Sequence, residues 1–178
     1  MIFALDPSLS CTGFALLSRD GATLIDHGRI GPDCDGDAYS RAASIASLAV
    51  LEIRKVKDRL AAVVIEAPQT FTRGMRGKRS AARLPNYGIA VGVITYAVDM
   101  ELKGAGVTLL RPSASEWTRG MPGTRGDDDK VRRVQAVERR FGLEIGSLGA
   151  KSVAGNVADA ALLGCWAAER LMMEGARK

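Results

Sequence analysis

The chain has 178 residues, 47% hydrophobic and 25% charged, which predicts one domain over residues 1–178 with a sizeable core and excludes a disordered chain. Its net charge of +5 is compatible with a polyanionic partner, although many basic proteins have none. Three cysteines without a CxxC pair, and no apolar run long enough to cross a bilayer, predict a cytoplasmic protein without structural zinc.

The first thirty residues predict three strands. Residues 1–6 form an apolar run that ends in Asp6, and residues 13–18 form a second run after a short link. An Asp-Gly pair at 20–21 is a strong hairpin signal, and the alternating stretch 22–30 behind it predicts an antiparallel third strand.

Helices and short strands alternate in the rest of the chain. Apolar residues recur at helical spacing from Ile45 to Leu60 and predict the first long helix. There follow a buried strand at 61–65, a helix at 87–103, a strand at 107–110, a helical turn at 112–118, and helices at 130–141 and 156–173, the last after a loop at 146–155. This order predicts an α/β fold with a mixed five-stranded sheet, three antiparallel strands and then parallel ones, flanked by helices.

Acidic side chains stand where three of these elements begin or end. Asp6 closes the first strand, Glu66 closes the fourth, and Asp159 lies in the last helix on the same face as Asn156. Phosphodiester hydrolysis is aided by two divalent ions about 4 Å apart, and such ions prefer carboxylate oxygens. The candidate catalytic and metal-binding residues are therefore Asp6, Glu66, Asn156 and Asp159.

Each of these residues also has an ordinary structural interpretation. Asn156 is suited to cap the last helix, with Asp159 in its first turn, and this is the commoner reason for such a pair. Asp6, followed by Pro and Ser, is suited to start a turn, and Glu66 to be a solvated strand end. Taken singly, structure and function are evenly balanced for these last two acids.

Three segments around these acids carry a resemblance to a known family. They are ALDPSLSCTGFA at 4–15, VIEAP at 64–68 and VADAA at 157–161, and the stretches 112–117 and 130–131 add to them. In this order they resemble the RuvC family of Holliday-junction resolvases. The resemblance spans nearly the whole chain. It implies an RNase H-like fold and a homodimer that cuts two strands of a four-way DNA junction. Each active site would use two Mg²⁺ ions, or Mn²⁺ in their place. The process served would be DNA recombination and repair.

One position departs from the family pattern. Many members carry another acid three residues before the last aspartate, where this chain has Asn156. Asparagine offers one neutral carbonyl oxygen, which bears on metal affinity and on activity. From the residues alone, Asn156 is either a natural variant or an inactivating Asp-to-Asn substitution.

Basic residues crowd the loop that follows Glu66, where they would hold a DNA backbone beside the acids. Phe71 in this loop is a candidate for stacking on an unpaired base. The resemblance also implies a role for Lys130 near the scissile phosphate. A solvated loop with its aromatic ring on the core, and an ordinary surface lysine, are the structural alternatives. The candidate DNA-binding residues are Phe71, Arg73, Arg76, Lys78, Arg79, Arg83 and Lys130.

Other patterns are weaker. The glycines at 74–79 lack the spacing of a phosphate-binding loop, the acids at 33–37 lack the glutamate of a calcium loop, and His27 has no obvious catalytic partner. The leading hypothesis is a magnesium-dependent endonuclease from a bacterium or phage, dimeric through the apolar helix 87–100, without a small-molecule cofactor or a membrane partner. One alternative is a branched-DNA-binding module that does not cut. Another is a nucleotide-binding protein of the sugar-kinase and actin type, although the short length of the chain counts against it.

Overall fold

The computed structural model describes residues 1–68, 84–119, 129–148 and 151–176. Its centre is a five-stranded sheet of order β3-β2-β1-β4-β5. Strands β1 (Ile2–Asp6), β2 (Thr12–Leu17) and β3 (Leu24–Ile30) are antiparallel, and β4 (Ala62–Ile65) and β5 (Thr108–Leu110) run parallel to β1. The predicted mixed sheet is therefore confirmed.

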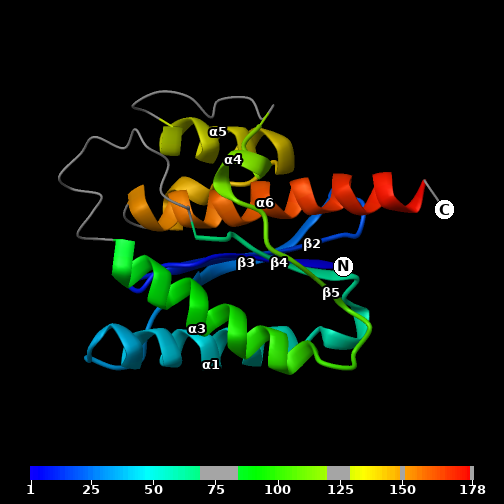
Figure 1. Ribbon diagram of the computed structural model, residues 1–178. Helices are drawn as coiled ribbons and strands as arrows, with labels where there is room; N and C mark the ends of the chain where they lie inside the picture. Colours follow the sequence, from blue (N-terminus) through cyan, green and yellow to red (C-terminus); the bar gives the residue numbers. More distant parts are fainter. Residues whose placement is uncertain (69–83, 120–128, 149–150, 177–178) are drawn as a thin grey trace.

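Helices cover both faces of this sheet in separate layers (Figure 1). One face packs against α1 (Ala38–Arg54) and α3 (Leu84–Leu102). The other packs against α6 (Lys151–Gly175), with α5 (Asp129–Phe141) and the single turn α4 (Ala114–Trp117) beyond it. The 3₁₀ turns are η1 (Lys57–Arg59) and η2 (Ile145–Leu148). None of the helices in these described ranges is long and apolar enough to cross a membrane.

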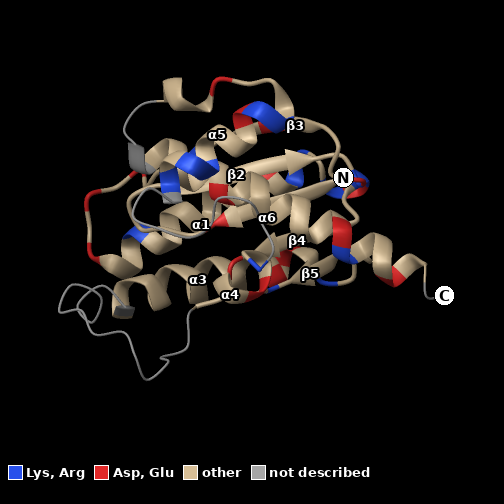
Figure 2. Cartoon of the chain, turned by 90° about the horizontal axis from the view of Figure 1, so that it is seen from above, with Lys and Arg blue, Asp and Glu red and all other residues tan. Residues whose placement is uncertain are grey.

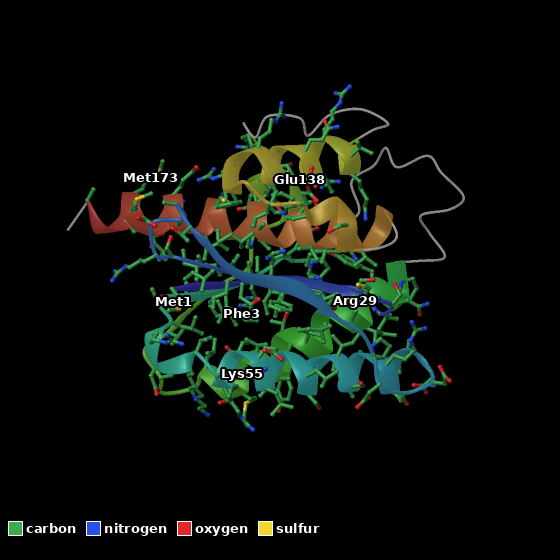
Figure 3. All side chains as sticks on the ribbon, turned by 180° about the vertical axis from the view of Figure 1, so that it is seen from behind. Met1, Phe3, Arg29, Lys55, Glu138 and Met173 are labelled. Carbon is green, nitrogen blue, oxygen red and sulfur yellow. The ribbon has the colours of Figure 1, made fainter. Side chains whose placement is uncertain are left out.

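Strand β1 is buried on both faces, because its side chains alternate between two cores. Ile2 and Ala4 belong to the core under α6, whereas Phe3 and Leu5 belong to the core over α1 and α3. Figure 3 shows Phe3 on the α1 side of the sheet, among the side chains that fill this space. A strand enclosed in this way holds its final residue, Asp6, at a well-defined place.

Helix α6 lies unusually close to the sheet, because glycines stand at the contacts. A Cβ atom added to Gly164 would lie 2.3 Å from a methyl carbon of Leu17 and 3.4 Å from the Cβ of Ala4. A Cβ added to Gly13 would lie 2.1 Å from the backbone oxygen of Asn156. The small residues of the two elements thus bring the backbone of α6 directly onto β2.

Several predicted helix boundaries were wrong, and two of them bear on the site and on the core. The last helix begins at Lys151, five residues before the predicted start, so Asn156 lies inside the helix and cannot be its cap. The first helix ends at Arg54, short of the prediction that it continues to Leu60. Leu60 keeps the helical apolar spacing because it packs into the core over α1 from an extended position after η1.

Candidate functional site

The first two acids meet at the carboxyl ends of neighbouring parallel strands. Leu5 of β1 is paired in register with Ile65 of β4, and the Glu66 N–H donates to the Leu5 carbonyl oxygen at 3.3 Å. Asp6 and Glu66 are the residues that follow this pair, so they emerge side by side at one edge of the sheet. Their proximity follows from strand register, as the sequence indicated.

Helix α6 brings the other two candidates to the same edge. Asn156 and Asp159 are 8% and 7% exposed, in a helix whose neighbouring residues are apolar and buried. The Asn156 Nδ2 donates to the Cys11 carbonyl oxygen at 2.6 Å and so ties the helix to the link that follows Asp6. Since Asp6 pairs with Gly13, the close contact of Gly13 with Asn156 sets the helix against this strand end.

The three carboxylates lie within reach of one another's charge. Burial raises the pKa of Asp6 well above its usual value, and the negative charges of Asp159 and Glu66 raise it further. The cationic side chains of Lys130 and Arg133 act in the opposite direction. The edge of the sheet is therefore a centre of concentrated negative charge.

Two positively charged side chains of α5 contact this acidic centre. The Lys130 Nζ donates to the Asn156 Oδ1 at 3.0 Å, and the Arg133 Nη1 lies 2.9 Å from the Asp159 Oδ1. The stem of Lys130 passes over Gly155, where an added Cβ would be 2.8 Å from its Cδ. Helix α5 is drawn from above in Figure 2, and its basic residues are Lys130, Arg132, Arg133, Arg139 and Arg140.

Glu66 is held by two aromatic side chains that the sequence analysis did not select. The Trp117 Nε1 donates to one carboxylate oxygen at 3.0 Å, and the Tyr87 hydroxyl donates to the other at 3.2 Å. Trp117 is placed by α4, which opens on a capping box where Ser113 donates to Glu116. Burial raises the pKa of Glu66, and the two hydrogen bonds lower it. Burial and the Glu66 charge raise the pKa of Tyr87.

The side chains of the four candidate residues offer oxygen ligands, which hard divalent cations prefer. The carboxylates of Asp6, Glu66 and Asp159 and the amide of Asn156 all offer oxygen ligands. Asp6 is a half-buried acid beside two like charges, and a bound cation would offset this repulsion. Among the residues that the structure describes, no three His, Cys, Asp or Glu side chains converge as they stand into a group that could hold an ion. Arg133 and the two aromatic donors engage the oxygens instead.

The other predicted contacts with DNA cannot be placed. Of the candidate set, Lys130 lies at the acidic centre, where the Asn156 amide accepts its hydrogen bond. The remaining candidates lie outside the described residues: Phe71, Arg73, Arg76, Lys78, Arg79 and Arg83. Arg133 was missed, although its spacing of three residues from Lys130 puts both on one face of α5.

A mixed sheet of this order, with acids at the ends of β1 and β4 and on the last helix, defines an RNase H-like fold. No protein-family model and no curated protein matches the sequence. Among solved structures, RuvC from T. thermophilus in complex with a Holliday junction substrate has a TM-score of 0.63 and 17% identity, with 96% of this chain and 94% of that chain covered.

Two further structures show the same likeness. A Thermus thermophilus RuvC structure has a TM-score of 0.62 and 18% identity, with 97% and 96% of the two chains covered. The yeast mitochondrial Holliday junction resolvase Ydc2 has a TM-score of 0.62 and 14% identity, with 99% of this chain and 81% of that chain covered. The chain therefore has the RNase H-like fold found in RuvC.

Proposed function

We propose that this chain is a structure-specific DNA endonuclease of the RuvC type. It resolves four-way junctions by magnesium-dependent phosphodiester hydrolysis and leaves paired nicks. The observation that carries the proposal is the placement of four residues at one edge of the sheet: Asp6 and Glu66 at neighbouring strand ends, and Asn156 and Asp159 on the helix packed beside them. Solved structures of the same fold include RuvC with a Holliday junction and a mitochondrial resolvase, which supports branched DNA as the substrate.

The four candidate residues would hold the metal through carboxylate and amide oxygens. Two Mg²⁺ ions, when bound, activate a water molecule and stabilise the charge on the leaving oxygen. Asp6 must be ionised to act as a ligand, and its raised pKa links metal binding to the loss of a proton. Trp117 and Tyr87 would orient Glu66 through their hydrogen bonds to its carboxylate, and Lys130 would supply a positive charge beside the acids for a phosphate oxygen.

We propose further DNA contacts from the segment that follows Glu66. Its basic residues would neutralise phosphates on either side of the cut, and Phe71 would stack on an unpaired base. These contacts would position DNA but not distinguish its sequence, because phosphates carry no sequence information. The net charge of +5 is in keeping with this use.

Paired nicks need two sites, so we propose a homodimer that matches the two-fold symmetry of a junction. Helix α3 is the proposed contact, because two of its large apolar side chains are unusually exposed: Tyr96 is 69% and Met100 is 51% exposed. A single domain over 1–178 in each subunit, acting in the cytoplasm, completes the proposal.

Asn156 fits its place as an asparagine. Its Oδ1 accepts from Lys130 and its Nδ2 donates to the Cys11 carbonyl oxygen, so both ends of the amide are used. An aspartate cannot donate to a carbonyl oxygen and would add a negative charge beside Asp6 and Asp159. We infer that Asn156 is a natural component of the site rather than an inactivating substitution.

The test is cleavage of a labelled four-way junction beside a linear duplex of the same sequences, in Mg²⁺ or EDTA. We expect paired nicks in the junction only, in Mg²⁺ only, with Asp6→Asn binding the junction but not cutting it. The control is Asp20→Asn, in the exposed hairpin between β2 and β3, which should cut normally. Undiminished cutting by Asp6→Asn would refute the site, and tight binding without nicks by the unaltered protein would refute the activity.

A further inference from the structure

Two helices meet at the acidic centre in matching register. Lys130 and Arg133 are three residues apart on α5, and their partners Asn156 and Asp159 are three residues apart on α6. Residues at this spacing lie on one face of a helix. The packing of α5 on α6, with Lys130 lying over Gly155, therefore places the Arg133 guanidinium on Asp159.

This ion pair differs from the surface pairs of the protein. The side chains of Arg133 and Asp159 are 16% and 10% exposed, whereas Arg54, which pairs with Glu101 between α1 and α3, is 59% exposed. Solvent screens a sheltered pair less than an exposed one. Removal of one partner from a sheltered pair is costly, because the other charge stays behind unpaired.

We propose that Arg133 is the resident counter-ion of Asp159 and competes with a divalent cation for this carboxylate, and so sets the metal affinity of the site. The inference rests on the proposed function, in which Asp159 is a metal ligand. A guanidinium does not lose its proton in a protein. Arg133 must therefore move away from Asp159, or stay and repel the incoming ion, and either event weakens metal binding.

The test measures metal binding directly, without DNA. Mg²⁺ and, separately, Mn²⁺ are titrated into the full chain by calorimetry, with the unaltered protein, Arg133→Met and Arg133→Lys. We expect Arg133→Met to lower the dissociation constant by about tenfold or more, since a positive charge close to the ion is lost. Arg133→Lys keeps the positive charge but replaces the planar guanidinium with a compact ammonium group. Its dissociation constant for the metal should lie between those of the unaltered protein and Arg133→Met.

A second readout is thermal stability. In EDTA, Arg133→Met should have a lower Tm than the unaltered protein, because Asp159 loses its partner. Saturating Mg²⁺ should raise the Tm of this variant by more than it raises that of the unaltered protein. The control is Arg139→Met, which removes the same charge from an exposed position of the same helix, where Arg139 donates to the Gln135 carbonyl oxygen. It should leave the dissociation constant unchanged.

The possible failures are distinguishable. If the unaltered protein binds neither ion, the proposed metal site is wrong and this inference is lost with it. If the unaltered protein binds metal but Arg133→Met binds it equally or more weakly, only the competition is wrong. If Arg133→Met does not fold, the Arg133→Lys dissociation constant decides, because an unchanged or higher value overturns the inference.

Discussion

Gly13 and Asn156 are in backbone contact: a Cβ on Gly13 would lie 2.1 Å from the Asn156 carbonyl oxygen and 2.7 Å from the Val157 nitrogen. The register of the sheet pairs Gly13 with Asp6. One glycine therefore sets the separation between the strand that carries the first acid and the helix that carries the last.

Gly13→Ala should damage both stability and cleavage. Its methyl group meets backbone rather than a flexible side chain, so α6 must shift, at a cost of about 3 kcal/mol or more. Urea denaturation and junction cleavage measure the two effects. Gly88→Ala is the control, because an added Cβ there has open space and alanine favours a helix. Equal stability of Gly13→Ala and the unaltered protein would mean that the helix does not lie this close.

Asn156→Asp should destabilise the protein in EDTA by about 1–2 kcal/mol. The new carboxylate faces the Cys11 carbonyl oxygen, where the amide donated, and it adds a fourth carboxylate to those of Asp6, Glu66 and Asp159. Because this charge is present only when the acid is ionised, the loss should grow as the pH rises from 4 to 8. Chemical denaturation at several pH values checks this. A gain in stability at neutral pH would show that the site prefers an acid at this position.

Trp117→Phe should leave Glu66 without its buried donor. The ring volume is largely kept, so the cost is mainly the hydrogen bond to a charged group, about 1.5–3 kcal/mol. The pKa of Glu66 should rise, because this bond lowers it, and the acid limb of the cleavage profile should move to higher pH. The comparison is Trp166→Phe in α6, which should leave that limb in place. If the acid limb of the pH–cleavage profile does not move in Trp117→Phe, Glu66 is not the group whose ionisation sets that limb.

Asp6→Asn should stabilise the protein in EDTA at pH 8 while it abolishes cleavage. The folded protein raises the pKa of Asp6 above its ordinary value, so ionisation of Asp6 opposes folding once the pH exceeds 3.8. The advantage of Asn should shrink as the pH falls through the raised pKa, and disappear near pH 4. Thermal unfolding at a series of pH values measures it.

Asp20→Asn should change the stability in the opposite direction to Asp6→Asn. Hydrogen bonds from Ser18 and the Ala22 N–H lower the pKa of Asp20, so its ionised form supports the fold above pH 3.8. This variant should be less stable at neutral pH, and the loss of stability should fade in acid.

For Asp6→Asn, a Tm at pH 8 lower than that of the unaltered protein would contradict the conclusion that ionisation of Asp6 opposes folding.

Tyr96→Glu should convert the proposed dimer into monomers, because a charge placed in an apolar contact loses its hydration. Analytical ultracentrifugation measures the mass in solution. Tyr39→Glu on α1 is the matched control, since Tyr39 is 65% exposed and lies on a different helix. A Tyr96→Glu protein with the mass of the unaltered one would remove α3 from the proposed interface.

The sheet and its acids were predictable from sequence because each signal is local. Apolar runs that end in Asp6 and Glu66 mark strand ends, and parallel neighbours align such ends by register alone. Tyr87 and Trp117 were not predictable in this way, because each reaches Glu66 from an element whose position depends on tertiary packing. The spacing of Arg133 from Lys130 places the two on one face of α5, but its contact with Asp159 depends on how α5 packs against α6.

The start of α6 was missed for a related reason. Residues 151–155 read KSVAG, and Ser, Val and Gly are weak helix formers. In the structure Val153 and Ala154 are both buried, Ala154 in the core under α6, and this packing stabilises the helix against its propensity. The same five residues move Asn156 from a cap into the helix interior, where its amide spans Lys130 and Cys11.

The acids of the centre are spread along the chain: Asp6 ends β1, Glu66 directly follows β4, and Asp159 lies on α6. Neither a nascent chain nor one truncated before α6 contains all three, and either leaves the apolar face of β1 and β2 uncovered. If the proposed function is right, a chain without α6 cannot cut DNA, because it lacks Asp159 as well as the helix that covers these strands.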